Sequence, residues 1–235
     1  MLHHHPSHPS HRPRVALVGN APLHRNFTKE IDCCEVVVRC NEAKNWGPHS
    51  GTKTDVLCIT QTGAPARRFI SEQSISRQSR FPDLKELWFF RQDRSLVDPI
   101  IEANNLQDIP IRWMAPDLFR TIQSDLHWRS QYDFSEPSTG FLAFQYILNA
   151  PEYKDYDKWL FGFNFQVWLG HPGHAEAQIV RELCTSRNDI LFHASPNRLG
   201  WLRQTYFELK YRLQGRLSVN PHRPRMRPDE RLPAT

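Results

Sequence analysis

Two histidines lie in a loop rich in glycine and proline, within the segment Gly-His-Pro-Gly-His-Ala-Glu at residues 170–176. Histidine titrates near neutral pH, so His171 or His174 in a cleft could take a proton from a substrate hydroxyl. A solvated loop stays open as an alternative, and so does a metal site, although the segment has no obvious third ligand. The residue types favour a general base.

A second polar group, Ser138, Thr139 and Gly140, precedes an apolar run at 141–148. A Ser/Thr pair that follows a proline is what the N-cap of a helix requires for structural reasons alone. The same arrangement suits a phosphate, because unpaired N–H groups and the helix dipole attract an oxyanion. Capping and phosphate binding both remain open on these residues alone.

Two asparagines each follow a short apolar run. Gly19 and Asn20 come directly after the run at 15–18, and Asn41 comes after the run at 36–39. A glycine lets a ligand approach the backbone, and an asparagine amide can both donate and accept hydrogen bonds. Each loop by itself is a weak signal, since a plain turn has the same composition.

Two common nucleotide-binding motifs are absent from the sequence. The loop at Gly19 is not Gly-x-Gly-x-x-Gly, which disfavours a nicotinamide or flavin enzyme. The segment Gly-Thr-Lys-Thr at 51–54 lacks the upstream glycine of a P-loop and precedes a strand where a P-loop precedes a helix. A structural interpretation is therefore open for Lys53, as a solvated charge at the rim of the protein.

The elements that must position these residues alternate between short β-branched runs and longer helical stretches. That alternation is typical of a mostly parallel sheet covered by helices, so we predict a single α/β domain. In such sheets the ligand lies beyond the carboxyl ends of the strands. The predicted strands are 15–18, 36–39, 55–59, 86–90, 109–113, 158–163 and 190–193, and the predicted helices are 66–76, 95–105, 116–128, 138–149, 174–186 and 197–213.

Composition and charge exclude several classes of protein. The chain has 235 residues with 39% hydrophobic and 23% charged residues, as in an ordinary globular protein. Its longest uncharged apolar run, 140–150, is shorter than the roughly 18 residues that cross a bilayer. The net charge of +5 lies in the ends, because residues 15–214 carry none. Nucleic acid is therefore not an expected partner.

The two ends differ in composition from the centre. We predict a disordered His/Pro-rich arm at 1–14, a catalytic domain at 15–214 and a basic, Pro-rich tail at 215–235. The five cysteines are odd in number and form no Cys-x-x-Cys pair, so we interpret them as free, mostly buried thiols. Free thiols predict a reducing, cytoplasmic compartment.

Taken in order, these loops resemble the sialyltransferase family that is defined by sialylmotifs L, S, III and VS. Motif L is resembled by Val-Ala-Leu-Val-Gly-Asn at 15–20, Val-Val-Val-Arg-Cys-Asn-Glu-Ala at 36–43 and Gly-Thr-Lys-Thr at 51–54. Motif S is resembled by Pro-Ser-Thr-Gly-Phe at 137–141 with Phe-Gly-Phe at 161–163, and motif VS by His171 and Glu176. The resemblance covers about residues 15–193.

The resemblance implies a modified GT-A, Rossmann-like fold and an inverting transfer that needs no metal and no cofactor. The donor would be CMP-sialic acid or a relative such as CMP-Kdo, the acceptor a glycan or glycolipid, and the general base His171. Glu176 would cap its own helix or orient the His171 loop. The residues implied to contact the CMP group are Gly19, Asn20, Asn41, Ser138, Thr139, Gly140, Gly162 and Phe163.

The sequence departs from the family pattern at two places. The cysteines that pair in motifs L and S are absent, since the corresponding positions fall at Val15 and near Asn149. This absence suits a bacterial-type cytoplasmic enzyme without an anchor. Motif III is not recognisable, and His174 or Trp168 could take over its histidine.

Two alternatives of other classes follow from the same residues. The missing motif III favours a CMP-binding protein on this fold that has lost transfer activity. The basic tail favours an adaptor at a membrane surface or on nucleic acid. The predicted helix 197–213 carries a leucine-rich stripe flanked by Arg and Lys, which suits packing on the sheet or peripheral contact with an anionic inner membrane.

Overall fold

The structure is a computed structural model that describes residues 12–75, 80–130, 134, 136–165 and 171–195. The arm before residue 12, the predicted helix 197–213, the tail 215–235 and Trp168 lie outside the described residues. Within the described residues no helix is long and apolar enough to cross a membrane.

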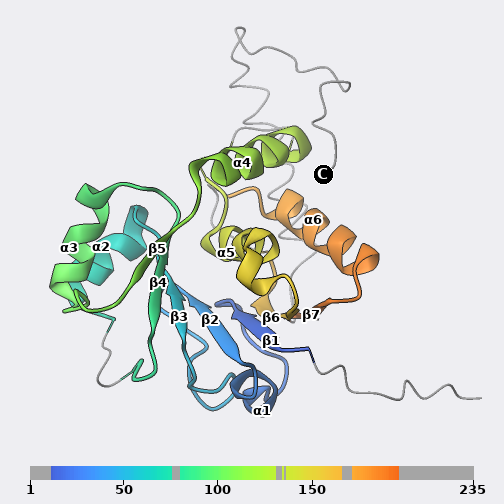
Figure 1. Ribbon diagram of the computed structural model, residues 1–235, viewed down its shortest axis with the longest axis horizontal. Coiled ribbons are helices and arrows are strands. Elements are labelled where there is room, and N and C mark those ends of the chain that lie inside the picture. Colours follow the sequence, from blue (N-terminus) through green and yellow to red (C-terminus); the bar gives the residue numbers. More distant parts are fainter. Residues whose placement is uncertain (1–11, 76–79, 131–133, 135, 166–170, 196–235) are drawn as a thin grey trace, which may run out of the picture.

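A single seven-stranded sheet forms the centre of the molecule, in the order β5-β4-β3-β2-β1-β6-β7 (Figure 1). Every neighbouring pair is parallel, which confirms the predicted α/β class. All seven predicted strands are present within one or two residues of their predicted ends. The strands are β1 (Arg14–Val18), β2 (Val36–Cys40), β3 (Val56–Cys58), β4 (Glu86–Phe89), β5 (Ile111–Trp113), β6 (Asp157–Phe163) and β7 (Ile190–Ala194).

Five helices match predictions, and one was missed. The helices are α1 (Thr28–Asp32), α2 (Gly63–Glu72), α3 (Arg94–Ala103), α4 (Pro116–Ser130), α5 (Thr139–Asn149) and α6 (Gly173–Ser186), with a 3-10 turn, η1 (Pro151–Tyr153), after α5. The missed helix α1 has five residues, no side-chain cap and one buried residue, Ile31, so it carries no periodic signal. Helix α2 begins before its predicted start at 66, because Pro65 is tolerated in a first turn.

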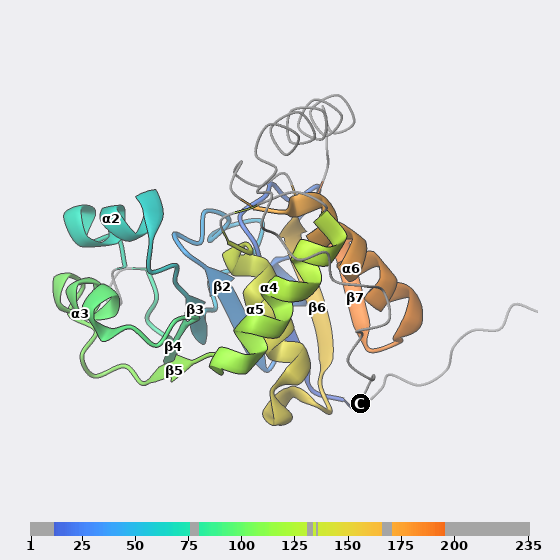
Figure 2. The same ribbon diagram turned by 90° about the horizontal axis from the view of Figure 1, so that it is seen from above.

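Alternation along the strands sends side chains to two faces with different helices. Val15 and Leu17 of β1 belong to the cluster under α4, α5 and α6, whereas Ala16 and Val18 join Phe27 and Ile31 around α1. A third cluster packs β3 and β4 against α2 and α3. Figure 2 shows α4, α5 and α6 over one end of the sheet and α2 with α3 at the other. Covering both faces explains why most residues of the central strands β1 and β2 are apolar.

Helix α5 is buried on most of its surface. Its buried residues are Gly140, Phe141, Leu142, Ala143, Phe144 and Ile147. A helix that is apolar nearly all round lies in a protein interior, and α5 packs against both the sheet and α4. Its N-terminus is therefore fixed in position by the core.

The cysteines are free thiols in the described chain, as predicted. Cys34, Cys40 and Cys58 are buried, whereas Cys33 is exposed and Cys184 is partly exposed. Burial raises the pKa of the Cys34 thiol to about 12. A thiol with a raised pKa has little thiolate, so Cys34 is a packing residue.

Candidate active site

The order of the strands marks the part of the sheet edge where ligands bind in folds of this class. Strands β2 to β5 extend from one side of β1, and β6 and β7 extend from the other. The connections therefore reverse direction between β1 and β6. In open parallel sheets the binding crevice lies at the carboxyl ends of the strands at this reversal. The predicted residues at Gly19 and Gly162 end these two strands.

The two strand ends approach each other at glycines. Any other residue at either position would force the backbone to move, because its Cβ would collide with the carbonyl of the other strand. Gly162 has a φ of +70°, and a Cβ there would lie 2.7 Å from the carbonyl oxygen of Gly19. A Cβ on Gly19 would lie 2.4 Å from the carbonyl oxygen of Gly162. The ring of Phe163 fills the space next to them and would lie 2.5 Å from a Cβ on Gly140. Four predicted site residues thus form one joint between β1, β6 and α5.

The two predicted asparagines bind neighbouring loops. Asn20 Nδ2 donates to the carbonyl of Cys40 at 3.0 Å, and its Oδ1 accepts from the N–H of Lys44 at 2.8 Å. Asn41 has a φ of +51°. Its Oδ1 accepts from the N–H of Thr60 at 2.9 Å, and its Nδ2 donates to Thr139 Oγ1 at 3.3 Å. The Asn41 amide therefore joins the ends of β2 and β3 to the start of α5.

Asn45 belongs to the same loops, although sequence reasoning missed it. Its Nδ2 donates to the carbonyl of Gly19 at 2.9 Å and also to that of Ala21. These bonds hold the backbone that follows β1 against the loop that follows β2. No periodicity or motif marks Asn45 in the sequence, because its partners lie more than twenty residues away.

Ser138 is the N-cap of α5, and its side chain accepts from the N–H of Phe141 at 3.3 Å. Its backbone N–H and hydroxyl both donate to the carboxylate of Glu176, at 2.6 and 2.7 Å. Glu176 is fully buried, and its burial raises the pKa of the carboxyl to about 7, against the lowering effect of the two bonds from Ser138. The donors of Ser138 are therefore occupied inside the protein.

This arrangement shows that Glu176 does not cap its own helix, which was one of its two expected roles. The N-cap of α6 is Pro172, and no side chain caps that end of the helix. The carboxylate of Glu176 instead crosses to the start of α5, 38 residues earlier in the chain. At the start of α5, the N–H groups of Thr139 and Gly140 have no acceptor within the helix, so they are the donors that an anion could meet.

The ring of His171 is partly buried and fixed by a backbone group. Its Nδ1 lies 2.7 Å from the carbonyl oxygen of Glu136. A carbonyl can only accept, so Nδ1 carries the proton and Nε2 is the basic nitrogen of the ring. His174 is exposed on the first turn of α6. The structure thus brings His171, the start of α5 and the β1–β6 joint to one edge of the sheet.

Three further residues at this edge were not singled out from the sequence: Arg91, Glu136 and Gln61. Arg91 follows β4, and its guanidinium forms an ion pair with the side chain of Glu136. Gln61 follows β3 and exchanges two hydrogen bonds with the backbone of Arg91, at 2.6 and 2.8 Å. Because both follow predicted strands, the rule about carboxyl ends could have identified them.

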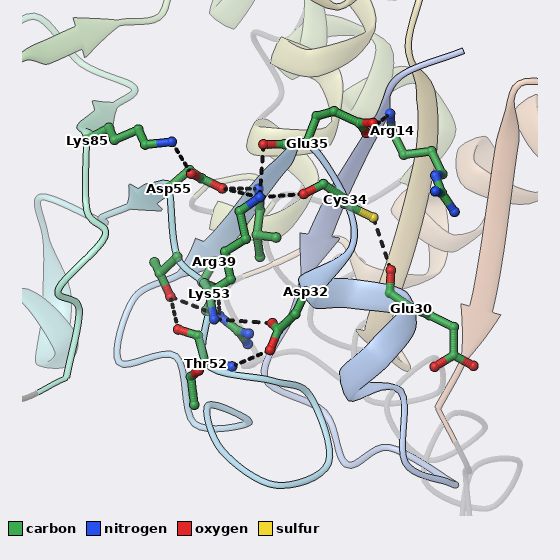
Figure 3. A network of polar contacts seen from close by, with 12 residues as sticks. Arg14, Glu30, Asp32, Cys34, Glu35, Arg39, Thr52, Lys53, Asp55 and Lys85 are labelled. Atoms are coloured by element: carbon green, nitrogen blue, oxygen red, sulfur yellow. Dashed lines mark hydrogen bonds and ion pairs between the residues drawn. The ribbon is translucent and has the colours of Figure 1, made fainter. Parts of the chain in front are cut away.

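The segment 51–54 of the motif L resemblance lies away from this edge, in a polar network before β3 (Figure 3). The buried guanidinium of Arg39 donates to the carbonyls of Ser50, Gly51 and Lys53. Burial lowers the pKa of Arg39 to about 10. Asp32 accepts from the N–H groups of Thr52 and Lys53, at 3.2 Å each.

Lys53 does not lie at a solvated rim, so that interpretation was wrong. Its ammonium group donates to the carbonyls of Cys34 and Glu35, and it lies 3.6 Å from a carboxylate oxygen of Asp55 (Figure 3). These bonds tie the start of β2 to the start of β3. The segment 51–54 therefore has a structural role in the described fold.

Two other features bear on what the molecule can bind. Within the described residues, no three or more His, Cys, Asp or Glu side chains gather as metal ligands would. A cavity of about 450 Å³ lies between α4, α5 and α6. Its lining includes Asn149 at the end of α5 and Ser186 at the end of α6, whereas the candidate site lies at the beginnings of these helices.

Comparison with known proteins gives the fold and no family. No protein-family model matches the chain. A curated protein, the urease operon 23 kDa accessory protein of Rhizobium meliloti (strain 1021), is 22% identical over 190 residues, which are 72% of this chain and 88% of that protein.

Two similar solved structures are sialyltransferases. The monofunctional alpha-2,3-sialyltransferase Cst-I of Campylobacter jejuni has a TM-score of 0.51 at 11% identity, over 81% of this chain and 79% of that chain. A variant of the sialyltransferase CST-II in complex with CMP has a TM-score of 0.50 at 13% identity, over 79% of this chain and 83% of that chain. These likenesses show that the chain has the α/β fold of these enzymes.

Proposed function

We propose that this protein is an inverting, metal-independent glycosyltransferase. It moves a sialic acid or a related ulosonic acid from its CMP-activated form to a glycan hydroxyl, and His171 is the general base. The observation that carries the proposal is the hydrogen bond of 2.7 Å between His171 Nδ1 and the carbonyl of Glu136. This bond favours the tautomer whose Nε2 can accept a proton, next to the anion-binding start of a helix.

The proposed reaction needs one proton acceptor and one stabilised leaving group. The acceptor hydroxyl oxygen attacks the anomeric carbon as the bond from that carbon to the CMP phosphate breaks. The hydroxyl proton passes to Nε2 of His171, a role that contributes about 10² to 10⁴-fold in enzymes. The sugar is oxocarbenium-like in the transition state, so negative charge grows on the departing phosphate.

The departing phosphate would meet fixed donors at the start of α5. The N–H groups of Thr139 and Gly140 lie in its first turn, and the Thr139 hydroxyl lies 3.3 Å from Asn41 Nδ2. Because these donors are held before the reaction starts, they stabilise the growing charge without reorganisation. Ser138 is used by Glu176, so we assign it to supporting this turn. Gly19, Asn20, Gly162 and Phe163 would shape the pocket for the nucleoside.

The test is a metal-free NMR assay of CMP release from CMP-N-acetylneuraminic acid and from CMP-Kdo, with a panel of soluble glycans as acceptors. We expect wild-type turnover with one donor and a loss of at least about 100-fold in the His171→Ala variant. His49→Ala, which removes an exposed histidine outside the site, should keep wild-type turnover. Calorimetry with CMP should give equal binding in all three proteins. Wild-type turnover in His171→Ala would exclude the proposed base.

A second candidate is a CMP-binding accessory protein without transfer activity. The similarity to the urease operon accessory protein favours it, together with the missing motif III. Calorimetric binding of CMP without turnover of either donor on any acceptor would support this candidate. A failure to bind CMP would contradict both.

A further inference from the structure

We propose that Arg91 is a positioning residue for the general base and acts on His171 through Glu136. The inference rests on the proposed function, because it concerns the same site. It differs from that function in assigning a task to Arg91, which follows β4, and to Glu136, which precedes α5. Neither residue touches the reacting atoms in this proposal.

Glu136 offers two different groups to its neighbours. Its backbone carbonyl accepts a hydrogen bond from Nδ1 of His171 at 2.7 Å. Its side chain forms an ion pair with Arg91 and lies 3.5 Å from the hydroxyl of Thr62. The side chain of Glu136 is 27% exposed and that of Arg91 is 43% exposed, so the pair is reachable by solvent. The direction of the Glu136 carbonyl therefore depends on where this side chain is anchored.

The segment that carries Glu136 is held at both of its ends. Ser138, two residues later, is fixed by its two bonds to Glu176 and by capping α5. On the other side, the Glu136 side chain is held by the ion pair with Arg91 and by its longer contact with the Thr62 hydroxyl. The intervening Pro137 is buried and stiff. Loss of the Arg91 anchor would leave the Glu136 side chain with only its 3.5 Å contact to Thr62, between the buried Phe134 and the buried Pro137.

Arg91 is itself well placed to act as an anchor. Gln61 is only 7% exposed, and it binds both the N–H and the carbonyl of Arg91. The guanidinium carbon of Arg91 also lies 5.7 Å from the ring centroid of Phe119. The guanidinium thus projects from a backbone that the ends of β3 and β4 fix.

The consequence for His171 concerns its tautomer and its orientation. While the carbonyl of Glu136 faces Nδ1, the proton stays on Nδ1 and Nε2 remains basic. A carbonyl that turns away allows the other tautomer, in which Nε2 carries the proton and cannot accept one. Removing Arg91 should therefore lower the fraction of molecules with a competent base and leave the affinity for CMP unchanged.

The experiment compares Arg91→Ala, Arg91→Lys and Glu136→Gln with wild type in the full chain. Long-range proton–nitrogen NMR of labelled histidines reports the tautomer of His171 without any substrate. We expect the Nδ1–H form to dominate in wild type and a mixture in Arg91→Ala and Glu136→Gln. Arg91→Lys should keep the wild-type tautomer, because an ammonium group can maintain an ion pair with Glu136.

Kinetics give the second readout. We expect kcat to fall about tenfold in Arg91→Ala with the donor KM and the CMP affinity changed less than about twofold. The Arg91→Ala and Glu136→Gln effects should be non-additive in the double variant, because both remove the same link. Arg94→Ala removes an exposed arginine that pairs with Asp98, and it should behave as wild type.

Each outcome decides for or against the proposal. A wild-type His171 tautomer in Arg91→Ala would overturn it, and so would a rise in donor KM at unchanged kcat, which would make Arg91 a substrate-binding residue. The tautomer measurement needs no turnover, so it remains valid if the proposed glycosyl transfer fails. Loss of activity in His171→Ala tests the function, whereas the tautomer tests the positioning.

Discussion

The buried carboxylate of Glu176 links two helices that are far apart in the sequence. It receives both donors of Ser138 and lies in the first turn of α6. Its pKa is raised from 4.5 to about 7, because burial disfavours the charged form. At neutral pH this residue therefore contributes a partly ionised group to the interior.

This raised pKa makes stability depend on pH. Since the folded protein holds the proton more tightly than the unfolded chain, the contribution to stability is complete below pH 4.5 and is lost as the pH rises through about 7. We expect Glu176→Gln, which resembles the neutral acid, to remove this loss. The unfolding free energy of Glu176→Gln minus that of wild type should therefore increase by on the order of 3 kcal/mol between pH 5 and pH 8.

Urea unfolding of both proteins at the two pH values measures this difference. Glu182→Gln is the control, because Glu182 is an exposed glutamate on the same helix. Equal pH slopes in wild type and Glu176→Gln would contradict the assignment of the titrating group.

At the scale of elements, the joint between β1 and β6 depends on a glycine. Gly162 combines a φ of +70° with a close approach to the carbonyl of Gly19. We expect Gly162→Ala to lower the free energy of unfolding by about 2 to 4 kcal/mol, because strain and a backbone contact add. It should also weaken CMP binding, since the end of β1 has to move.

Gly63→Ala is the matched control for this prediction. Gly63 has nearly the same φ, +76°, but its nearest contact is an ordinary one, 3.8 Å from Pro65. It should therefore cost only the strain of a positive φ, about 1 to 2 kcal/mol. Urea unfolding measures both variants. An equal decrease in unfolding free energy in the two would show that the contact with Gly19 does not contribute to stability.

A buried ion pair joins the start of β6 to the start of β7. The ammonium group of Lys158 at the start of β6 is 2% exposed and lies 2.9 Å from Asp189, just before β7. Arg187 and Lys158 hold the pKa of Asp189 well below its usual range. We expect Asp189→Asn to lower the free energy of unfolding by about 3 to 5 kcal/mol, because a buried charge loses its partner.

Thermal or urea unfolding at neutral pH measures the effect of Asp189→Asn. Asp98→Asn, which removes the exposed partner of Arg94, should change the stability by less than about 1 kcal/mol. A small effect in both variants would indicate that the backbone carbonyls around Lys158 suffice to stabilise its charge.

At the scale of the whole molecule, the net positive charge lies in the two terminal segments of the sequence. Residues 15–214 carry no net charge, and the tail 215–235 contains five arginines against two acids. We expect a chain that ends at Gln214 to bind anionic liposomes at least about tenfold more weakly than the full chain, because each basic residue near such a surface contributes about 1 kcal/mol. Transfer to soluble glycans should be unchanged.

Sedimentation with liposomes of defined phosphatidylglycerol content tests the role of the tail. High salt should release the full chain, since screening weakens attraction between exposed charges. Equal sedimentation of both chains would remove the membrane interpretation and would leave the tail without this role.

Within the residues that the structure describes, the sequence alone predicted the parallel α/β class, all seven strands and five of the six helices. These features depend on local patterns of apolar residues, which the sequence contains directly. It also singled out Gly19, Asn41, Gly140 and His171 as candidate site residues, and their roles in binding and catalysis stay predictions. The short helix α1 was missed, since five residues with one buried side chain leave no pattern.

The tertiary structure alone decided which partners these residues have. The bonds from Ser138 to Glu176, from His171 to Glu136 and from Asn45 to Gly19 join segments 26 or more residues apart. They form because β1 and β6 become neighbours at the point where the strand order reverses. A local pattern cannot encode that neighbourhood, since it follows from packing both faces of the sheet against helices.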